Sequence, residues 1–183
     1  KACNEGTPSS CALLGNMYFD GKNIEQNYQE AVNFHQKACD GGIMLSCYNL
    51  GLWHYEGREI LQDLNKSHAF YNKACDGKIA KACHNLGEFY LEGIGVSKDS
   101  TKASKLFKQA CNDGFSNSCY ELGLLYENAK KYSEARKFYK KACDDDIAQA
   151  CKNLGYLYAN GLDIPKDSKK AATFYTKSCD LGD

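Results

Sequence analysis

Cysteine is the residue type whose number and spacing in this sequence point most directly to chemistry. The chain contains 11 cysteines. Ten of them form pairs eight positions apart, as in KACDGGIMLSC (residues 37–47), and the remaining one is Cys179. The five pairs are Cys3 and Cys11, Cys39 and Cys47, Cys75 and Cys83, Cys111 and Cys119, and Cys143 and Cys151.

Three chemistries are compatible with regularly spaced cysteines, and two of them fit this spacing poorly. Zinc sites favour cysteines two to four residues apart with histidines at short range. The four histidines, His35, His54, His68 and His84, occupy unrelated positions instead. A reactive thiol requires one cysteine in an environment set apart from the others, whereas these cysteines form a series. The sequence therefore predicts no metal site and no cofactor.

Disulfide formation is the reading that fits all five pairs. Each pair flanks a short turn between two expected helices, and such positions can reach the Cα separation of about 5–6 Å that a disulfide requires. We predict that each of the five pairs forms a local disulfide, worth roughly 2–3 kcal/mol in the chain-entropy estimate. Five disulfides indicate an oxidising compartment, so we expect a secreted or periplasmic protein that matures with the help of a periplasmic disulfide-forming oxidoreductase.

The first cysteines of successive pairs, together with Cys179, recur at steps of 36, 36, 36, 32 and 36 residues. A fixed period in this range is typical of a repeat array. We expect one array over residues 1–183, with repeats at approximately 11–46, 47–82, 83–118, 119–150 and 151–183. The last repeat is expected to be truncated and the array to continue beyond both ends, with a cysteine eight positions after Cys179.

Each repeat has the pattern of two helices. The motif CxxLGxxY, as in Cys83–Tyr90, spaces its apolar residues by three and four, which is typical of one helical face. A loop follows, then an N-capping Asn or Asp, and then a second apolar stripe such as Ala31, Phe34 and Ala38. Glycine within the first helix allows close approach of a neighbouring helix. The sequence therefore predicts an all-α, right-handed superhelical solenoid of αα-hairpins.

Composition excludes several classes of partner. The chain has 23 basic and 23 acidic residues, and no run of like charge suggests a phosphate-binding stripe. No apolar segment approaches the roughly 18 residues of a membrane helix. We therefore expect neither nucleic-acid binding nor membrane insertion.

The segment LGEFYLEGIGVSKDSTKASKLFKQAC (residues 86–111) resembles the Sel-one-like repeats, which are relatives of tetratricopeptide repeats. A pair of cysteines at every repeat junction makes the chain similar to the Helicobacter cysteine-rich protein family. This resemblance implies a secreted or periplasmic protein, recognised by the host as an antigen, with penicillin binding and weak β-lactamase activity. The sequence, however, contains no S-x-x-K, S-D-N or K-T-G motif, which serine β-lactamases use.

The resemblance also implies which residues face a binding groove, because the first helix of each hairpin lines the concave side of such solenoids. The residues expected there are Asn16, Tyr48, Leu52, Tyr55, His84, Glu88, Tyr120, Leu124, Lys152, Tyr156 and Asn160. Tyrosine combines a large apolar area with a hydrogen-bonding tip, so these tyrosines either anchor a partner or pack against the next repeat. The predicted function is binding of a peptide or protein partner, host-derived or bacterial, and the alternative is binding and weak hydrolysis of β-lactams.

Two further patterns have a structural and a functional interpretation. His84 and Glu88 are spaced i,i+4, so they form either an acid–base couple or, as we expect, a helix-surface pair. The recurrent Tyr18, Tyr90, Tyr126 and Tyr158 are expected to pack within the repeats.

Overall fold

The computed structural model describes residues 3, 7–57 and 60–183. Ten helices and no strands are present in these ranges, which confirms the all-α prediction of successive helical hairpins. Each helix has 13 residues: α1 (Pro8–Asp20), α2 (Tyr28–Asp40), α3 (Met44–Glu56), α4 (Leu64–Asp76), α5 (Ala80–Glu92), α6 (Ser100–Asn112), α7 (Ser116–Asn128), α8 (Tyr132–Asp144), α9 (Ala148–Asn160) and α10 (Ser168–Asp180).

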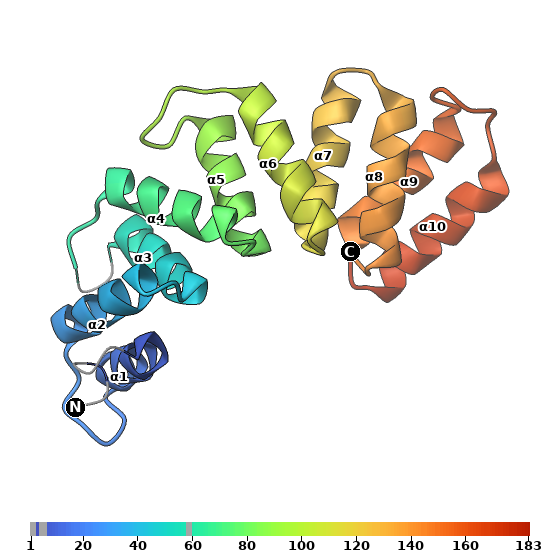
Figure 1. The fold of residues 1–183 in the computed structure, drawn as a ribbon. Coiled ribbons are helices and arrows are strands. Elements are labelled where there is room, and N and C mark those ends of the chain that lie inside the picture. Colours follow the sequence, from blue (N-terminus) through green and yellow to red (C-terminus); the bar gives the residue numbers. More distant parts are fainter. Residues whose placement is uncertain (1–2, 4–6, 58–59) are drawn as a thin grey trace. The chain divides into compact units, whose positions relative to one another are not determined.

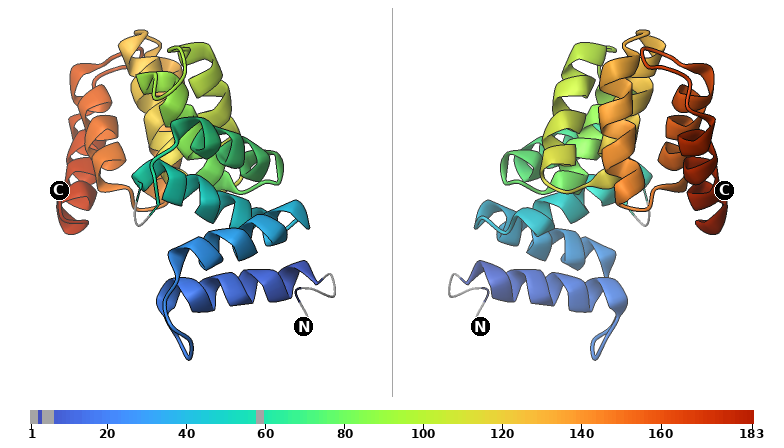
Figure 2. Two further views of the ribbon diagram at one scale, coloured as in Figure 1. Left: turned by 90° about the vertical axis from the view of Figure 1, so that its left-hand side faces the viewer. Right: turned by 90° about the vertical axis from the view of Figure 1, so that its right-hand side faces the viewer.

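The chain divides into two compact units, Lys1–Ser100 and Thr101–Asp183. In the first unit α1 pairs with α2 and α3 with α4, and α5 packs on α4. In the second unit α7 pairs with α8 and α9 with α10 (Figure 1). Both views of Figure 2 show α1 and α2 running side by side as a hairpin, joined by a loop at one end. Each of these four hairpins pairs the first helix of a repeat with its second helix.

The second helices begin where the sequence predicts an N-cap. The side chains of Asn27, Asp63 and Asp167 each accept a hydrogen bond from the backbone N–H three residues later, at 2.9–3.0 Å. These bonds satisfy N–H groups that have no partner within the helix. Helix α8 differs, because its N-cap Lys131 offers no side-chain oxygen and only residues 129–131 separate α7 from α8.

A tight turn joins each second helix to the next first helix. The third residue after the first cysteine has a left-handed φ in every such turn, at Gly42, Lys78, Gly114 and Asp146. The next backbone N–H donates back to the last helical turn, as from Ile43 to the Ala38 carbonyl at 2.9 Å. This backbone geometry brings the two flanking cysteines together.

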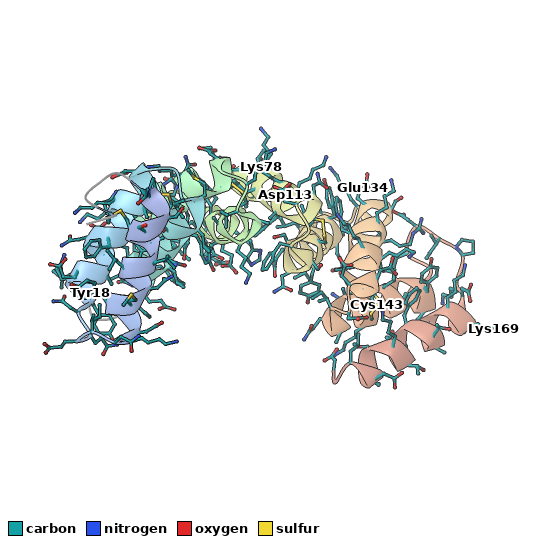
Figure 3. The ribbon with its side chains drawn as sticks, turned by 60° about the horizontal axis from the view of Figure 1, so that its bottom comes forward. Tyr18, Lys78, Asp113, Glu134, Cys143 and Lys169 are labelled. Atoms are coloured by element: carbon teal, nitrogen blue, oxygen red, sulfur yellow. A yellow bond between two sulfur atoms is a disulfide. The ribbon has the colours of Figure 1, made fainter. Side chains whose placement is uncertain are left out.

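Four disulfides cross these turns, and a fifth joins Cys3 to Cys11 of α1. They join the same five pairs that the spacing predicts: Cys3–Cys11, Cys39–Cys47, Cys75–Cys83, Cys111–Cys119 and Cys143–Cys151. Their Cα separations are 4.6–4.9 Å, at the short end of the range for disulfides. Figure 3 labels Cys143, which lies on α8 and bonds to Cys151 on α9, and Lys78 in the turn between α4 and α5. Cys179 has no disulfide and is exposed.

Successive second helices are also linked by lysines near their C-terminal ends. Lys141 on α8 donates to the backbone carbonyl of Cys111 on α6, and Lys177 on α10 donates to that of Cys143 on α8, both at 2.7 Å. The last carbonyls of a helix lack partners within the helix and carry the negative end of its dipole, so an ammonium group there is favourable.

The recurrent tyrosines of the first helices pack, as predicted, three of them within their own repeats and Tyr90 against His68 of α4, with its hydroxyl 3.1 Å from His68 Nε2. Tyr18, Tyr126 and Tyr158 stack on Phe34, Phe138 and Phe174 of the paired second helix, with ring centroids 5.4–5.6 Å apart. His54 takes the same place in the second repeat and stacks on Phe70 at 5.7 Å. The repeat tolerates histidine here because a planar ring is what the stack requires.

Candidate functional site

Helices α3 and α5 bring three of the predicted groove residues around one small cavity. Leu52, Tyr55 and Glu88 line it together with residues that the sequence analysis did not select. The cavity, which we call the inner hollow, has a volume of about 90 Å³. Its full lining is Leu52, Tyr55, Glu56, Tyr71, Asn85, Glu88, Phe89 and Ile94.

The glycine of the first helix determines the depth of this hollow. A Cβ added at Gly51 would lie 2.6 Å from the ring of Tyr71, closer than any real Cβ contact, so the ring rests directly on the α3 backbone. The equivalent glycines Gly15 and Gly123 are covered in the same way by His35 and Tyr139. In these three repeats an aromatic or imidazole ring of the second helix thereby reaches through to the first-helix side.

Tyr71 is the centre of an aromatic cluster at the floor of the inner hollow. Its ring lies 5.8 Å from Phe89 in an edge-on arrangement and 5.9 Å from Tyr48, while Tyr55 lies 5.6 Å from Phe89. Tyr71 is only 1% exposed, and this burial raises the pKa of its phenol. Tyr71 is therefore a neutral packing residue, whereas Tyr55, which is 38% exposed, presents its ring to solvent.

Two predicted groove residues on α5 form a pair beside the hollow. His84 Nε2 lies 3.5 Å from Glu88 Oε1, one helical turn apart. The imidazole is nearly buried and the carboxylate half-exposed. The arrangement is the helix-surface pair expected from the spacing, with Glu88 at the rim of the inner hollow.

In the second unit the predicted residue Tyr120 of α7 packs against Tyr139 of α8. The Tyr120 ring lies 6.0 Å from Tyr139, and the Tyr139 hydroxyl donates a hydrogen bond to the Glu127 carboxylate. Burial raises the pKa of both tyrosines, and a side-chain hydrogen bond with Asn153 opposes this effect in each. These groups form a hydrogen-bonded polar network around the buried Tyr139.

The other predicted residues are exposed or locally bonded. Lys152 pairs with Asp183 at 3.2 Å, and the Asn160 amide donates to the Tyr156 carbonyl within α9. Tyr156 is exposed, Leu124 is half-buried, and Asn16 is exposed on α1. The structure thus gathers Leu52, Tyr55 and Glu88 around one cavity.

Sequence analysis missed five residues of the inner hollow, although two of them leave a signal. An aromatic or imidazole ring recurs four positions after the small residue of each second helix, as at His35, Tyr71, Phe107, Tyr139 and Tyr175. Asparagine recurs two positions after the second cysteine, as at Asn49, Asn85 and Asn153. Neither of these two patterns includes Glu56, Phe89 or Ile94.

A second kind of cavity lies between the second helix of one repeat and the loop of the next. In the first unit it has a volume of about 450 Å³, and its lining includes His54, Leu61 and Phe70. In the second unit an equivalent cavity of about 360 Å³ lies beside Arg136, Tyr158 and Pro165. We call these the edge hollows.

One buried Ser–His pair has the residue types of a nucleophile and a base. His35 Nδ1 lies 3.0 Å from Ser46 Oγ. Each residue is only 1% exposed, so no substrate can reach the hydroxyl, and burial lowers the pKa of His35 to about 4. The pair is a packing contact between α2 and α3.

The described residues contain no cluster of three or more side chains suited to a metal ion. None of the helices in this part of the chain combines the length and apolar character needed to cross a bilayer.

Comparison with known proteins identifies the repeat. The Sel1 repeat matches residues 8–43, 45–78, 80–115, 116–146 and 148–183. No curated protein sequence matches the chain.

Solved structures of this type are similar to the chain. A Sel1 repeat protein from Oxalobacter formigenes is 26% identical with a TM-score of 0.83, over 97% of this chain and 72% of that one. A protective antigen present in uropathogenic Escherichia coli strains, displaying an SLR fold, is 28% identical with a TM-score of 0.93, over 100% of this chain and 40% of that one. The chain therefore spans well under half the length of that antigen.

Helicobacter pylori cysteine-rich protein B is 29% identical with a TM-score of 0.52, over 61% of this chain and 86% of that one. The matched segments cover nearly the whole sequence, and each begins at or near the start of a first helix. The chain belongs to the Sel1 repeat family.

Proposed function

We propose that this protein binds an extended peptide or a segment of a partner protein through the first-helix side of its repeats. The observation that carries the proposal is the inner hollow, where Tyr55 presents an exposed ring beside Leu52 and above the buried Tyr71. Rigid aromatic side chains at the mouth of an apolar hollow are typical anchors for a partner side chain. Sel1 repeats generally mediate protein–protein interactions, which supports the same reading.

The location that we propose is the periplasm or the extracellular space. Five disulfides indicate an oxidising compartment. The similar Escherichia coli protein is described as a protective antigen, and the similar Helicobacter pylori protein is also cysteine-rich. These likenesses favour a partner met outside the cytoplasm, host-derived or bacterial.

No observation favours β-lactam hydrolysis over binding. The sequence lacks the serine–lysine motif, and the buried serines Ser67 and Ser178 donate to the helix backbone carbonyls of Gly51 and Ala148. A serine held in that way is a helix-packing group, so we propose binding without turnover.

The test of this function is the replacement of Tyr55 by alanine. We expect Tyr55→Ala to weaken capture of a bound peptide by at least tenfold, because truncation of an aromatic anchor commonly costs about 2 kcal/mol or more. Tyr48 and Tyr120 are less suitable, since both are partly buried against other tyrosines and their loss would also disturb packing.

Peptides from a phage-displayed random nonapeptide library, selected on the immobilised protein, supply the probe, and fluorescence anisotropy supplies the affinity. Leu61→Ala is the matched control, because Leu61 is 91% exposed and lines the edge hollow of the same unit. Binding that survives Tyr55→Ala and is lost in Leu61→Ala would move the site to the edge hollow and contradict the proposal.

A further inference from the structure

The inner hollow carries two carboxylates at its rim, and they come from different helices. Glu56 is the last residue of α3, and Glu88 lies in the middle of α5. Glu88 is half-exposed, and its partner in the structure is the nearly buried imidazole of His84. Among the described residues, the lining includes no lysine or arginine. The lining of the hollow therefore combines two carboxylates with apolar and aromatic side chains, in a protein whose formal charge is zero.

The walls below these carboxylates are aromatic and aliphatic. Tyr55, Tyr71 and Phe89 surround the hollow with rings, and Leu52 and Ile94 complete it. Ring faces attract cations, and the aliphatic stem of lysine or arginine packs well on apolar surface. A volume of about 90 Å³ admits part of one side chain, and it is well below the roughly 300 Å³ of a typical small-molecule site.

From these features we infer that the inner hollow binds one lysine or arginine side chain of the partner, with the charged head group between Glu56 and Glu88 and the stem against the rings. This inference rests on the proposed function and names the partner's chemistry. An acidic side chain at the same place would meet two carboxylates, and a purely apolar one would exclude water from their oxygens without offering them a hydrogen bond, which is costly.

The second unit lacks the two carboxylates on which the preference for a basic side chain depends. The repeat positions of Glu56 and Glu88 are occupied there by Asn128 on α7 and Tyr156 on α9. The glutamate of that region, Glu127, accepts a hydrogen bond from Tyr139. We therefore expect the basic preference at the first unit alone.

The experiment selects nonapeptides from the phage-displayed random library on the whole protein, and retains those whose binding is lost in Tyr55→Ala. We expect lysine or arginine to be enriched at one position of the retained peptides. A synthetic peptide in which citrulline, the neutral isostere, replaces that arginine should bind about tenfold more weakly to the wild-type protein, as expected for hydrogen bonds to charged groups.

Glu88→Gln should remove most of that difference, so that the arginine and citrulline peptides bind within about threefold of each other. Glu92→Gln is the matched control, because Glu92 lies one turn further along α5, outside the hollow, and pairs with Lys98 at 3.9 Å. Measuring the arginine and citrulline peptides on both the wild-type protein and Glu88→Gln isolates the interaction between the peptide's guanidinium group and the Glu88 carboxylate.

The outcomes separate the two proposals. Retained peptides without a basic preference, or an equal citrulline effect in wild-type protein and Glu88→Gln, overturn the inference and leave the proposed function standing. A selection that yields no peptide dependent on Tyr55 overturns both.

Discussion

At the scale of single residues, the glycine within each first helix lowers the intrinsic stability of that helix, but it serves as a packing position. Glycine in a helix interior costs up to about 1 kcal/mol relative to alanine. Here it lets the ring of the paired second helix rest on the backbone, as Tyr71 does on Gly51. The ring then fills the space between successive repeats, which outweighs the local cost.

Gly51→Ala is therefore expected to destabilise the protein by about 1–3 kcal/mol, because the added methyl would lie 2.6 Å from the buried Tyr71 ring. Gly155→Ala is the matched comparison, since its neighbour Tyr175 lies at 3.0 Å and is 36% exposed, so the ring can move. Urea unfolding measures both changes. A larger loss from Gly155→Ala than from Gly51→Ala would contradict this explanation.

His35 gives the stability of the first unit a pH dependence. Its pKa is lowered from 6.5 to about 4 by burial, so between these values the unfolded chain binds the extra proton. The associated stability is fully present above pH 6.5 and is lost as the pH falls through 6.5 towards 4. From pH 7.5 to pH 5 the loss from this group is about 2 kcal/mol.

The matched variant follows from the other repeats. His35 faces Ser46, whereas Tyr71 and Tyr139 occur with Ala82 and Ala150 at the equivalent position. We expect the double variant His35→Tyr/Ser46→Ala to lose less stability than the wild-type protein when urea unfolding is repeated at pH 7.5 and pH 5. An identical pH dependence in both proteins would show that His35 is not the titrating group.

At the scale of the element, the four disulfides from Cys39–Cys47 to Cys143–Cys151 each close a turn whose backbone is already specified by hydrogen bonds and a left-handed residue. Because the linked positions are only eight apart in sequence, the closed loop is short and its entropic contribution is at the lower end for disulfides. Each disulfide therefore stabilises the junction of two consecutive helices and does not connect distant parts of the chain.

Replacing Cys75 and Cys83 together by alanine should lower the free energy of unfolding by roughly 2–3 kcal/mol. Hydrogen exchange should quicken first at the end of α4 and the start of α5, where the bond lies. Cys179→Ala serves as the control, because this thiol is free and exposed, and its change should stay within about 0.5 kcal/mol. Equal losses in the two proteins would refute a stabilising role for the bridge.

At the scale of the whole molecule, the count of thiols tests the redox state. With five disulfides and the exposed Cys179, this chain should show one thiol reactive towards Ellman's reagent when folded, and 11 after reduction in denaturant. Reduction should also lower the melting temperature markedly. More than one reactive thiol in the folded, oxidised protein would contradict the pairing.

The sequence by itself determined the repeat, the helical hairpins, the caps and the cysteine pairing, because each depends on residues close together in the chain. Period, apolar spacing and N-capping side chains are local signals, and an eight-residue disulfide is a local bond. The same signals placed Tyr18, Tyr126 and Tyr158 in the packing of their repeats, where they stack on the phenylalanines of the second helix.

Only the tertiary structure decided which candidate residues share a cavity. Tyr71 comes from a second helix, and it reaches the first-helix side because Gly51 leaves room for its ring. Glu56 and Glu88 lie on different helices and meet at one hollow only because α3 and α5 pack around the intervening α4. Such a site depends on the distances between side chains of different repeats. A repeat pattern describes every repeat in the same way, so it contains no information about those distances.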